Sequence, residues 1–208
     1  MIDPKILFMF FTTSVLLALS PGPDNLFVMT QAVRQGRKAG LLVTLGLCTG
    51  LLFHTAAVTF GLVELFKASA VAFNALKFAG AGYLLYLAWQ AFRAGVDTGP
   101  TTAADRLDSA ALYRRGIIMN ITNPKVSIFF LAFLPQFADP ARGNLSAQIL
   151  LLGGVFIIAT IIVFGAISFM AGVFGERFRR SAFAQKVLNR TAAGIFAGLA
   201  LKLTLAQR

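Results

Sequence analysis

The sequence predicts an all-α, polytopic membrane protein with six transmembrane helices, arranged as a 3+3 inverted repeat in which helices 1 and 4 are broken. Three observations lead to this fold. Hydrophobic residues make up 57% of the 208 residues and charged residues only 13%, whereas soluble domains average about 45–50% and about 25%. Six stretches are apolar and long enough to cross a bilayer. Two of these stretches contain proline at equivalent depths.

The six apolar stretches have the length that a membrane-spanning helix needs. A helix rises about 1.5 Å per residue, so about 20 apolar residues cross a hydrocarbon layer of about 30 Å. The first stretch is too long to be the apolar part of a cleaved signal peptide, and we expect it to be retained. The last carries Arg190 and Lys202 near its ends, where long side chains reach the interfaces. The predicted spans are residues 6–33, 39–63, 68–92, 116–138, 147–175 and 187–206.

The basic residues predict the orientation of these spans. The formal net charge is +11, but the cations form short clusters beside the spans and not one continuous face, which argues against nucleic acid as a partner. One side of the membrane holds most of them, and the positive-inside rule places that side in the cytoplasm. Both termini are then expected outside. The cytoplasmic cations are Arg34, Arg37, Lys38, Arg93, Arg106, Arg114, Arg115, Arg177, Arg179, Arg180, Lys186 and Arg190.

A polar segment divides the chain into two halves. Residues 95–111 predict a cytoplasmic linker between a first three-helix repeat, residues 1–94, and a second, residues 112–208. Because each half has an odd number of spans, the two halves cross the membrane in opposite directions. Lipids surround both, and glycine motifs in the spans are compatible with packing within one chain or in a homo-oligomer.

The first span of each half is interrupted by proline. Pro21 and Pro23 flank Gly22 in the first half, and Pro124 follows Asn123 in the second. Counting at about 1.5 Å per residue from the nearest cytoplasmic arginine puts both breaks about 14–15 Å deep, near the midplane. Paired interruptions in inverted halves indicate the binding site of a transporter. The alternative is two kinks that serve packing alone.

Asp24 lies directly after the first break and is the carboxylate deepest in a predicted span. A carboxylate at the centre of a bilayer costs about 2.5–3.5 kcal/mol on insertion scales, so it indicates function. It is a candidate proton carrier and a candidate partner for a substrate ammonium group. The alternative is a cap for the helix that follows Pro23, and a cap is compatible with a proton carrier.

The second break carries a matching cation and two amides. Lys125 is expected to pair with Asp24, to hold a substrate carboxylate, or, alternatively, to reach an interface. Asn120 and Asn123 offer donors and acceptors around the break, or act as caps. His54, midway along the second span, favours an interhelical hydrogen bond over a proton relay.

Enzymatic chemistry has little support in the composition. The chain has one cysteine, Cys48, and one histidine, His54, so it holds no internal disulfide framework and no metal site built from Cys and His. We expect no cofactor and no enzymatic activity. Beside a transporter, the sequence leaves open a structural or accessory subunit of a membrane complex, and a channel.

Several motifs resemble, in order, those of the LysE/RhtB family of amino-acid exporters. No single motif is specific, but the ordered set covers nearly the whole chain up to the last span. The matching segments are Ser20-Pro21-Gly22-Pro23, Gly36-Arg37-Lys38-Ala39-Gly40, Gly46 and Gly50, the stretch from Lys77 to Leu87 with Arg93, Arg115-Gly116, Asn120, Asn123-Pro124-Lys125, and Leu134-Pro135-Gln136-Phe137.

The resemblance implies export of amino acids or close derivatives, such as homoserine, threonine, lysine or leucine, across the bacterial inner membrane. It implies that the proton motive force drives this export as antiport, so the partners are the amino acid and protons. The family's two proline motifs fall on the residues that we expect to bind substrate or couple protons, namely Ser20, Pro21, Gly22, Pro23, Asp24, Asn120, Asn123, Pro124 and Lys125.

Overall fold

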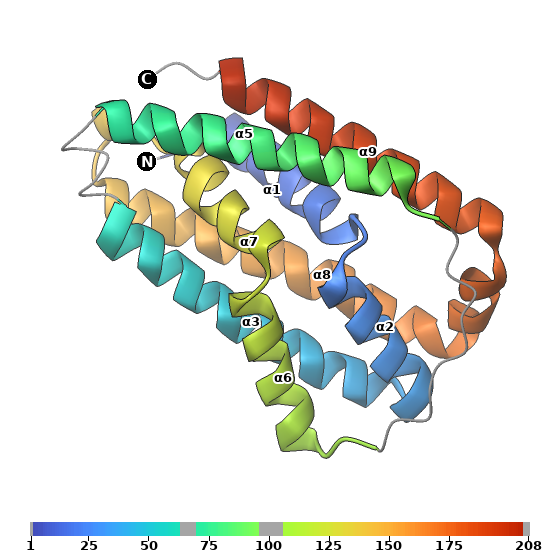
Figure 1. Cartoon of the computed structure of the whole chain (residues 1–208). Helices are drawn as coiled ribbons and strands as arrows, with labels where there is room; N and C mark the ends of the chain where they lie inside the picture. Colours follow the sequence, from blue (N-terminus) through green and yellow to red (C-terminus); the bar gives the residue numbers. More distant parts are fainter. Residues whose placement is uncertain (1, 63–69, 96–105, 206–208) are drawn as a thin grey trace.

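The computed structural model describes residues 2–62, 70–95 and 106–205, and all regular structure within these ranges is helical. Most of the predicted linker lies outside them, as do a few residues at the ends of the second, third and sixth predicted spans. Figure 1 shows long helices packed side by side, with two of the paths through the molecule sharply bent.

The first bent path consists of α1 (Pro4–Leu19) and α2 (Pro23–Gln35), whose axes differ by 63°. Proline has no amide hydrogen and clashes with the preceding turn, so a helix breaks before it and starts readily from it. Pro23 accordingly occupies the first turn of α2. The predicted break is therefore found where the proline motif lies.

The second bent path begins with α6 (Ser109–Ile121), and its axis changes by 49° at the break. It continues through α7 (Pro124–Ile128), the π-helical turn η2 (Phe129–Phe133) and the 3-10 turn η3 (Leu134–Phe137). The helix α6 starts inside the segment that the sequence assigned to the linker, because Asp108 caps it by accepting a hydrogen bond from the amide of Ala111 at 2.6 Å.

Two long helices lie between these paths. The helix α3 (Arg37–Ala57) continues into the π-helical turn η1 (Val58–Leu62), and α8 (Leu145–Arg180) follows the short 3-10 turn η4 (Pro140–Arg142). Gly36 joins α2 to α3 with φ of 87°, a left-handed conformation that favours glycine. The remaining helices, α5 (Ala70–Arg93) and α9 (Ala182–Leu205), pack antiparallel against each other (Figure 1).

Two helices of the described chain are long and apolar enough to cross a membrane by themselves, Arg37–Gly61 and Leu145–Ala171. The number rises to four if each bent path counts as one span. The helices α5 and α9 do not meet the same criterion in the described residues, and both carry cations, among them Lys77 and Lys202. The all-helical architecture is therefore confirmed for the described residues, and it is consistent with a multi-pass membrane protein, whereas the six-span count stays a prediction.

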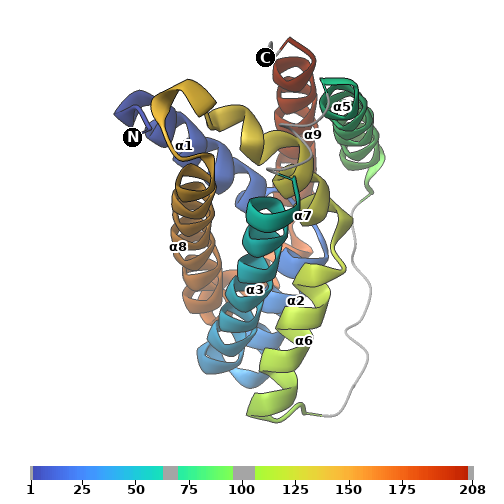
Figure 2. The ribbon, with the colours of Figure 1, turned by 90° about the vertical axis from the view of Figure 1, so that its left-hand side faces the viewer.

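Glycines allow α3 and α6 to approach closely. A Cβ atom on Gly46 would collide with the backbone carbonyl of Tyr113, and one on Gly116 would lie 2.5 Å from the carbonyl oxygen of Val43. The hydroxyls of Thr49 and Tyr113 share a hydrogen bond of 2.8 Å beside this contact. The two halves of the chain thus touch along these helices, as Figure 2 shows from the side.

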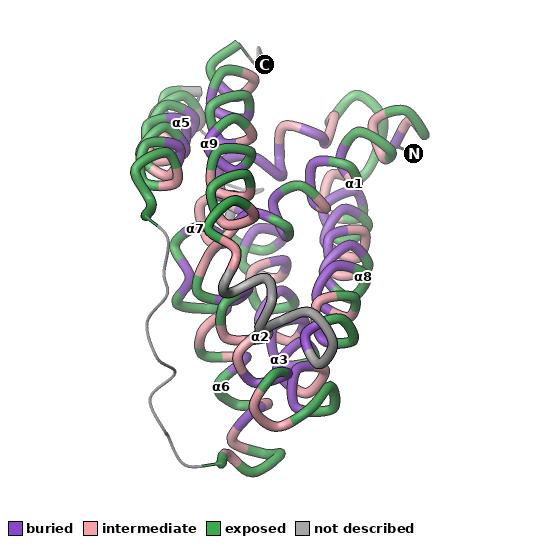
Figure 3. Tube along the Cα trace, turned by 90° about the vertical axis from the view of Figure 1, so that its right-hand side faces the viewer, coloured by how far each residue is buried: buried purple, intermediate pink, exposed green. Residues whose placement is uncertain are grey.

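The apolar core lies along the part of the second bent path that follows its break. Phe129, Phe130 and Phe133 are fully buried, and their rings contact those of Phe10 and Phe156 from α1 and α8. Figure 3 shows buried residues facing the interior of the bundle and exposed ones on its outside. Many exposed side chains are large and apolar, as expected of a surface that faces lipid.

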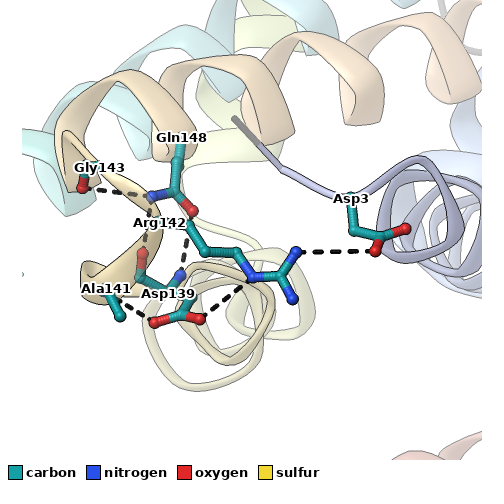
Figure 4. Close-up of polar contacts among 6 residues, drawn as sticks. All are labelled: Asp3, Asp139, Ala141, Arg142, Gly143 and Gln148. Carbon is teal, nitrogen blue, oxygen red and sulfur yellow. Dashed lines mark hydrogen bonds and ion pairs between the residues drawn. The ribbon is translucent and has the colours of Figure 1, made fainter.

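A polar cluster fixes the loop between η3 and α8 (Figure 4). Gln148 is buried; its side-chain nitrogen donates to the carbonyl of Asp139 at 2.8 Å, and its oxygen accepts from the amide of the same residue at 3.0 Å. Arg142 joins the loop to the start of α1, with ion pairs to Asp139 at 3.3 Å and to Asp3 at 3.6 Å. The ion pairs are half-exposed, whereas the hydrogen bonds of Gln148 are part-buried.

We expect Gln148→Leu to destabilise the protein more than Arg142→Ala. The first change leaves the half-buried amide of Asp139 without its partner, which costs about 1–3 kcal/mol. The carbonyl of Asp139 keeps its hydrogen bond from the amide of Arg142. The second removes half-exposed ion pairs, which are worth about 0–1 kcal/mol. Thermal unfolding of both purified variants in detergent measures the difference. An equal loss of melting temperature in the two variants would contradict this account of the loop.

Candidate functional site

Four helix ends lie together at the two breaks. α1 ends and α2 begins at the first break, and α6 ends and α7 begins at the second. A helix end leaves backbone N–H and C=O groups without partners inside the helix, and in a membrane interior these groups need partners from the protein, water or substrate. The side chains that follow the two prolines, Asp24 and Lys125, each reach across to the other path.

Lys125 satisfies the end of α1. Its side chain is buried, with 6% exposure, and its Nζ donates to the carbonyl of Ser20 at 3.0 Å and to that of Leu17 at 3.4 Å. A cation is favoured at a helix C-terminus, where carbonyl groups carry partial negative charge. Gly22 leaves room for this ammonium group, since a Cβ there would lie 3.1 Å from Nζ. Lys125 therefore makes a contact between the two halves of the chain, and its partners are backbone carbonyls. Its buried ammonium group does not reach out to a membrane interface, which was the alternative.

Asp24 lies in the first turn of α2 and approaches the end of α6. It is 3% exposed, and its Oδ2 accepts from the side-chain nitrogen of Asn120 at 3.5 Å, a long hydrogen bond. Among the described residues no direct ion pair joins Asp24 to Lys125, although the two charges lie near enough to attract each other. The N-cap of α2 is Gly22, which has no side chain, so Asp24 does not act as the cap.

Asn123 caps α7, as one of the sequence interpretations has it. Its Oδ1 accepts from the amide of Lys125 at 3.0 Å, which orders the first turn after the break. Pro124 occupies the first position of that turn. The side chains of Pro23 and Pro124 are exposed, so these prolines shape the site through the backbone and do not line it.

Two residues missed or little weighted in the sequence complete the surroundings. Asn25 donates to the carbonyl of Ala18 at 2.6 Å, which closes the end of α1 from the α2 side. The sequence could have indicated Asn25, because it directly follows Asp24 at the break. His54 on α3 contacts the carbonyl of Asn120 through Nε2 at 3.1 Å, which confirms the expected interhelical hydrogen bond.

Several polar atoms of this cluster are buried without a hydrogen-bond partner. Most are acceptors, because the set contains one carboxylate oxygen and two amide oxygens, against one amide nitrogen and one hydroxyl. Buried polar atoms without a partner in the protein are rare, and such atoms are candidates to bind a ligand or an ordered water. An excess of acceptors favours a cation as the ligand. The atoms are Asp24 Oδ1, Asn25 Oδ1, Asn120 Oδ1, Asn123 Nδ2 and Ser20 Oγ.

The chemistry of this cluster is that of recognition. Among the described residues, no three His, Cys, Asp or Glu side chains come together in a way that could hold a metal ion. The cluster instead contains one carboxylate, one ammonium group and amides, placed at the helix ends. Such a set is chemically suited to a zwitterion, whose two charges it can meet by ion pairing and hydrogen bonding. It contains no activated nucleophile.

The family model for LysE type translocators matches residues 15–207. The chain belongs to this family. The resemblance predicted from the proline motifs is thereby confirmed, and the family is one of translocators and not of enzymes. The match includes both breaks and every residue of the cluster described above.

Individual relatives agree with this assignment. A Salmonella typhi protein described as a homoserine/homoserine lactone efflux protein is 40% identical over 156 residues, which are 75% of this chain and 75% of that protein. A Vibrio cholerae protein described as an uncharacterized membrane protein is 31% identical over 205 residues, 99% of each chain. A Bacillus subtilis membrane protein, YrhP, is 29% identical over 201 residues, 92% of this chain and 95% of that protein. No solved structure matches the chain.

Gly50 on α3 makes room for Asn120, and we expect Gly50→Ala to disturb the cluster. The new Cβ would lie 2.6 Å from Asn120 Oδ1 and 2.7 Å from its Cβ. Overpacking of this kind costs about 1–3 kcal/mol. The variant should therefore unfold at a lower temperature than the wild type, as measured by thermal unfolding of the purified protein in detergent.

The matched control is Gly154→Ala on α8, where a Cβ meets no atom within 4 Å. It should leave the melting temperature unchanged or raise it slightly, because alanine favours a helix over glycine. Equal melting temperatures for the two variants would contradict the close packing of Asn120 against α3.

Proposed function

We propose that this protein exports amino acids or close derivatives across the bacterial inner membrane in exchange for protons. The site is the cluster at the two breaks. The observation that carries the proposal is the buried Asp24 carboxylate, which has one oxygen without a hydrogen-bond partner and one that accepts a single long hydrogen bond, from Asn120 of the other half. The names of the relatives from Salmonella support efflux of small amino-acid-like molecules.

The two charged ends of an amino acid have complementary partners in this cluster. Its ammonium group binds the acceptor oxygens of Asp24, Asn25 and Asn120, which are otherwise unpaired. Its carboxylate binds near Lys125 and the first turn of α2, whose N-cap Gly22 provides no side-chain acceptor. A helix N-terminus favours an anion through its free amide groups and its dipole.

Proton exchange uses the same carboxylate. A proton and a substrate ammonium group compete for Asp24, since each neutralises the buried charge. Proton entry from the outside therefore releases the amino acid, and loss of the proton to the cytoplasm restores the site. Alternating access between the two sides completes the cycle, with the paired breaks at the centre.

The membrane arrangement in this proposal has six spans in two inverted repeats. The helices α5 and α9 have 24 residues each, about 36 Å of helix, which is long enough to cross the hydrocarbon layer. The turn between α2 and α3 and the turn between α8 and α9 lie away from the two chain ends (Figure 1). Arg34, Arg37 and Lys186 flank these turns, so the positive-inside rule places them in the cytoplasm and both termini outside.

Asp24→Asn should abolish proton-driven efflux. The amide keeps the size of the side chain but removes the charge that binds an ammonium group or a proton. Hydrogen bonds to charged groups are worth about 1.5–3 kcal/mol, so efflux should fall at least about tenfold. The measurement is transport of a panel of amino acids by the purified protein in vesicles with an imposed pH gradient, with and without an uncoupler.

The control is Asp108→Asn at the exposed start of α6, where asparagine is an equally good cap. It should transport as the wild type does. Wild-type rates in Asp24→Asn would remove Asp24 from the mechanism. If the wild-type protein moved no amino acid in vesicles, the accessory-subunit alternative would replace export, and flux that is independent of protons would indicate a channel.

A further inference from the structure

A cleft of about 380 Å³ lies beside the cluster, between the end of α1 and the first half of α9. Figure 3 faces the side of the molecule on which these two helices lie. The cleft's walls are almost entirely apolar, and its volume is at the lower end of the range for small-molecule sites, about 300–1,000 Å³. Its wall includes Leu16 and Leu19 on α1 and Ala184, Leu188 and Ala192 on α9.

Ser20 belongs to both the cleft and the cluster. It lines the cleft, yet its carbonyl accepts the hydrogen bond from Lys125 Nζ at 3.0 Å. Its side chain is 1% exposed, and its Oγ has no hydrogen-bond partner. The apolar cleft therefore begins where the polar cluster ends, with one unpaired hydroxyl at the boundary.

We infer that this cleft receives the side chain of the transported molecule and that the substrates are α-amino acids with aliphatic side chains of about the size of leucine. The inference rests on the function proposed above. With the ammonium and carboxylate groups held in the cluster, the side chain is the remaining part of the molecule, and the neighbouring space is apolar. A second charge in that space would lose its hydration without gaining a partner.

Ala184 and Leu188 on α9 set the size of the cleft. Ala184 and Leu188 are one helical turn apart, half-buried, and on the same wall. A single methylene in an apolar pocket changes discrimination by about 10- to 200-fold. Leucine efflux should therefore exceed alanine efflux at least about tenfold at low internal concentration, and lysine efflux should be lower than that of leucine.

The test compares leucine and alanine efflux from vesicles that contain wild type, Ala184→Leu or Leu188→Phe. Each change adds bulk to the cleft, so the ratio of leucine to alanine efflux should fall at least about tenfold. Two variants are used so that a folding defect in one does not decide the result. The matched control is Ala182→Leu, an exposed position on α9 that does not line the cleft and should keep the wild-type ratio.

A wild-type ratio in both filled variants, or equal efflux of leucine and alanine by the wild type, would overturn the inference. The cleft would then be a place for lipid chains, in keeping with the exposed Phe183 and Val187 at its rim. These outcomes leave amino-acid export intact. Absence of any amino-acid efflux by the wild type would instead overturn the proposed function together with this inference.

Discussion

The hydrogen bonds from Lys125 to the carbonyls of Ser20 and Leu17 are the interaction on which the arrangement of this protein depends. A helix that ends inside a membrane leaves carbonyl groups that cannot remain unpaired, since each costs several kcal/mol. Lys125 comes from the other broken path, so the two breaks satisfy each other and are held at one place. The cation is in turn made tolerable by the carbonyl groups of α1, which take the role of an anion.

Asp24 and Lys125 hold equivalent places, each directly after the proline that opens the second part of a broken path, but they are satisfied to different degrees. Lys125 has two carbonyl partners. Asp24 accepts a single hydrogen bond, at 3.5 Å, and its other oxygen accepts none. A site that completed all of its own hydrogen bonds would have nothing to offer a ligand. Of the two charges, Asp24 therefore has more hydrogen-bonding capacity left for a ligand.

The sequence predicts the broken paths and the buried charges well, because proline acts on its own helix and apolar length is a local property. The cap formed by Asn123 follows from the same local rules. The partner of Lys125 could not be predicted, since it depends on a backbone carbonyl more than one hundred residues away. The space that Gly50 leaves for Asn120 is likewise a property of two helices in contact. The start of α6 lay inside the expected linker because a cap at Asp108 outweighs the polar composition around it.

A shared carboxylate ties the direction of export to the proton gradient in the proposed cycle. If the ammonium group and the proton had separate sites, each could bind without displacing the other, and exchange would need a conformational coupling between the two sites. At Asp24 the unpaired Oδ1 and the weakly held Oδ2 belong to one charge, so neutralisation by either ligand removes the attraction for the other. The same logic requires that no second carboxylate take over when Asp24 is protonated. Of the other carboxylates, those whose side chains the structure describes, Asp3, Asp108 and Asp139, lie at exposed or half-exposed helix starts.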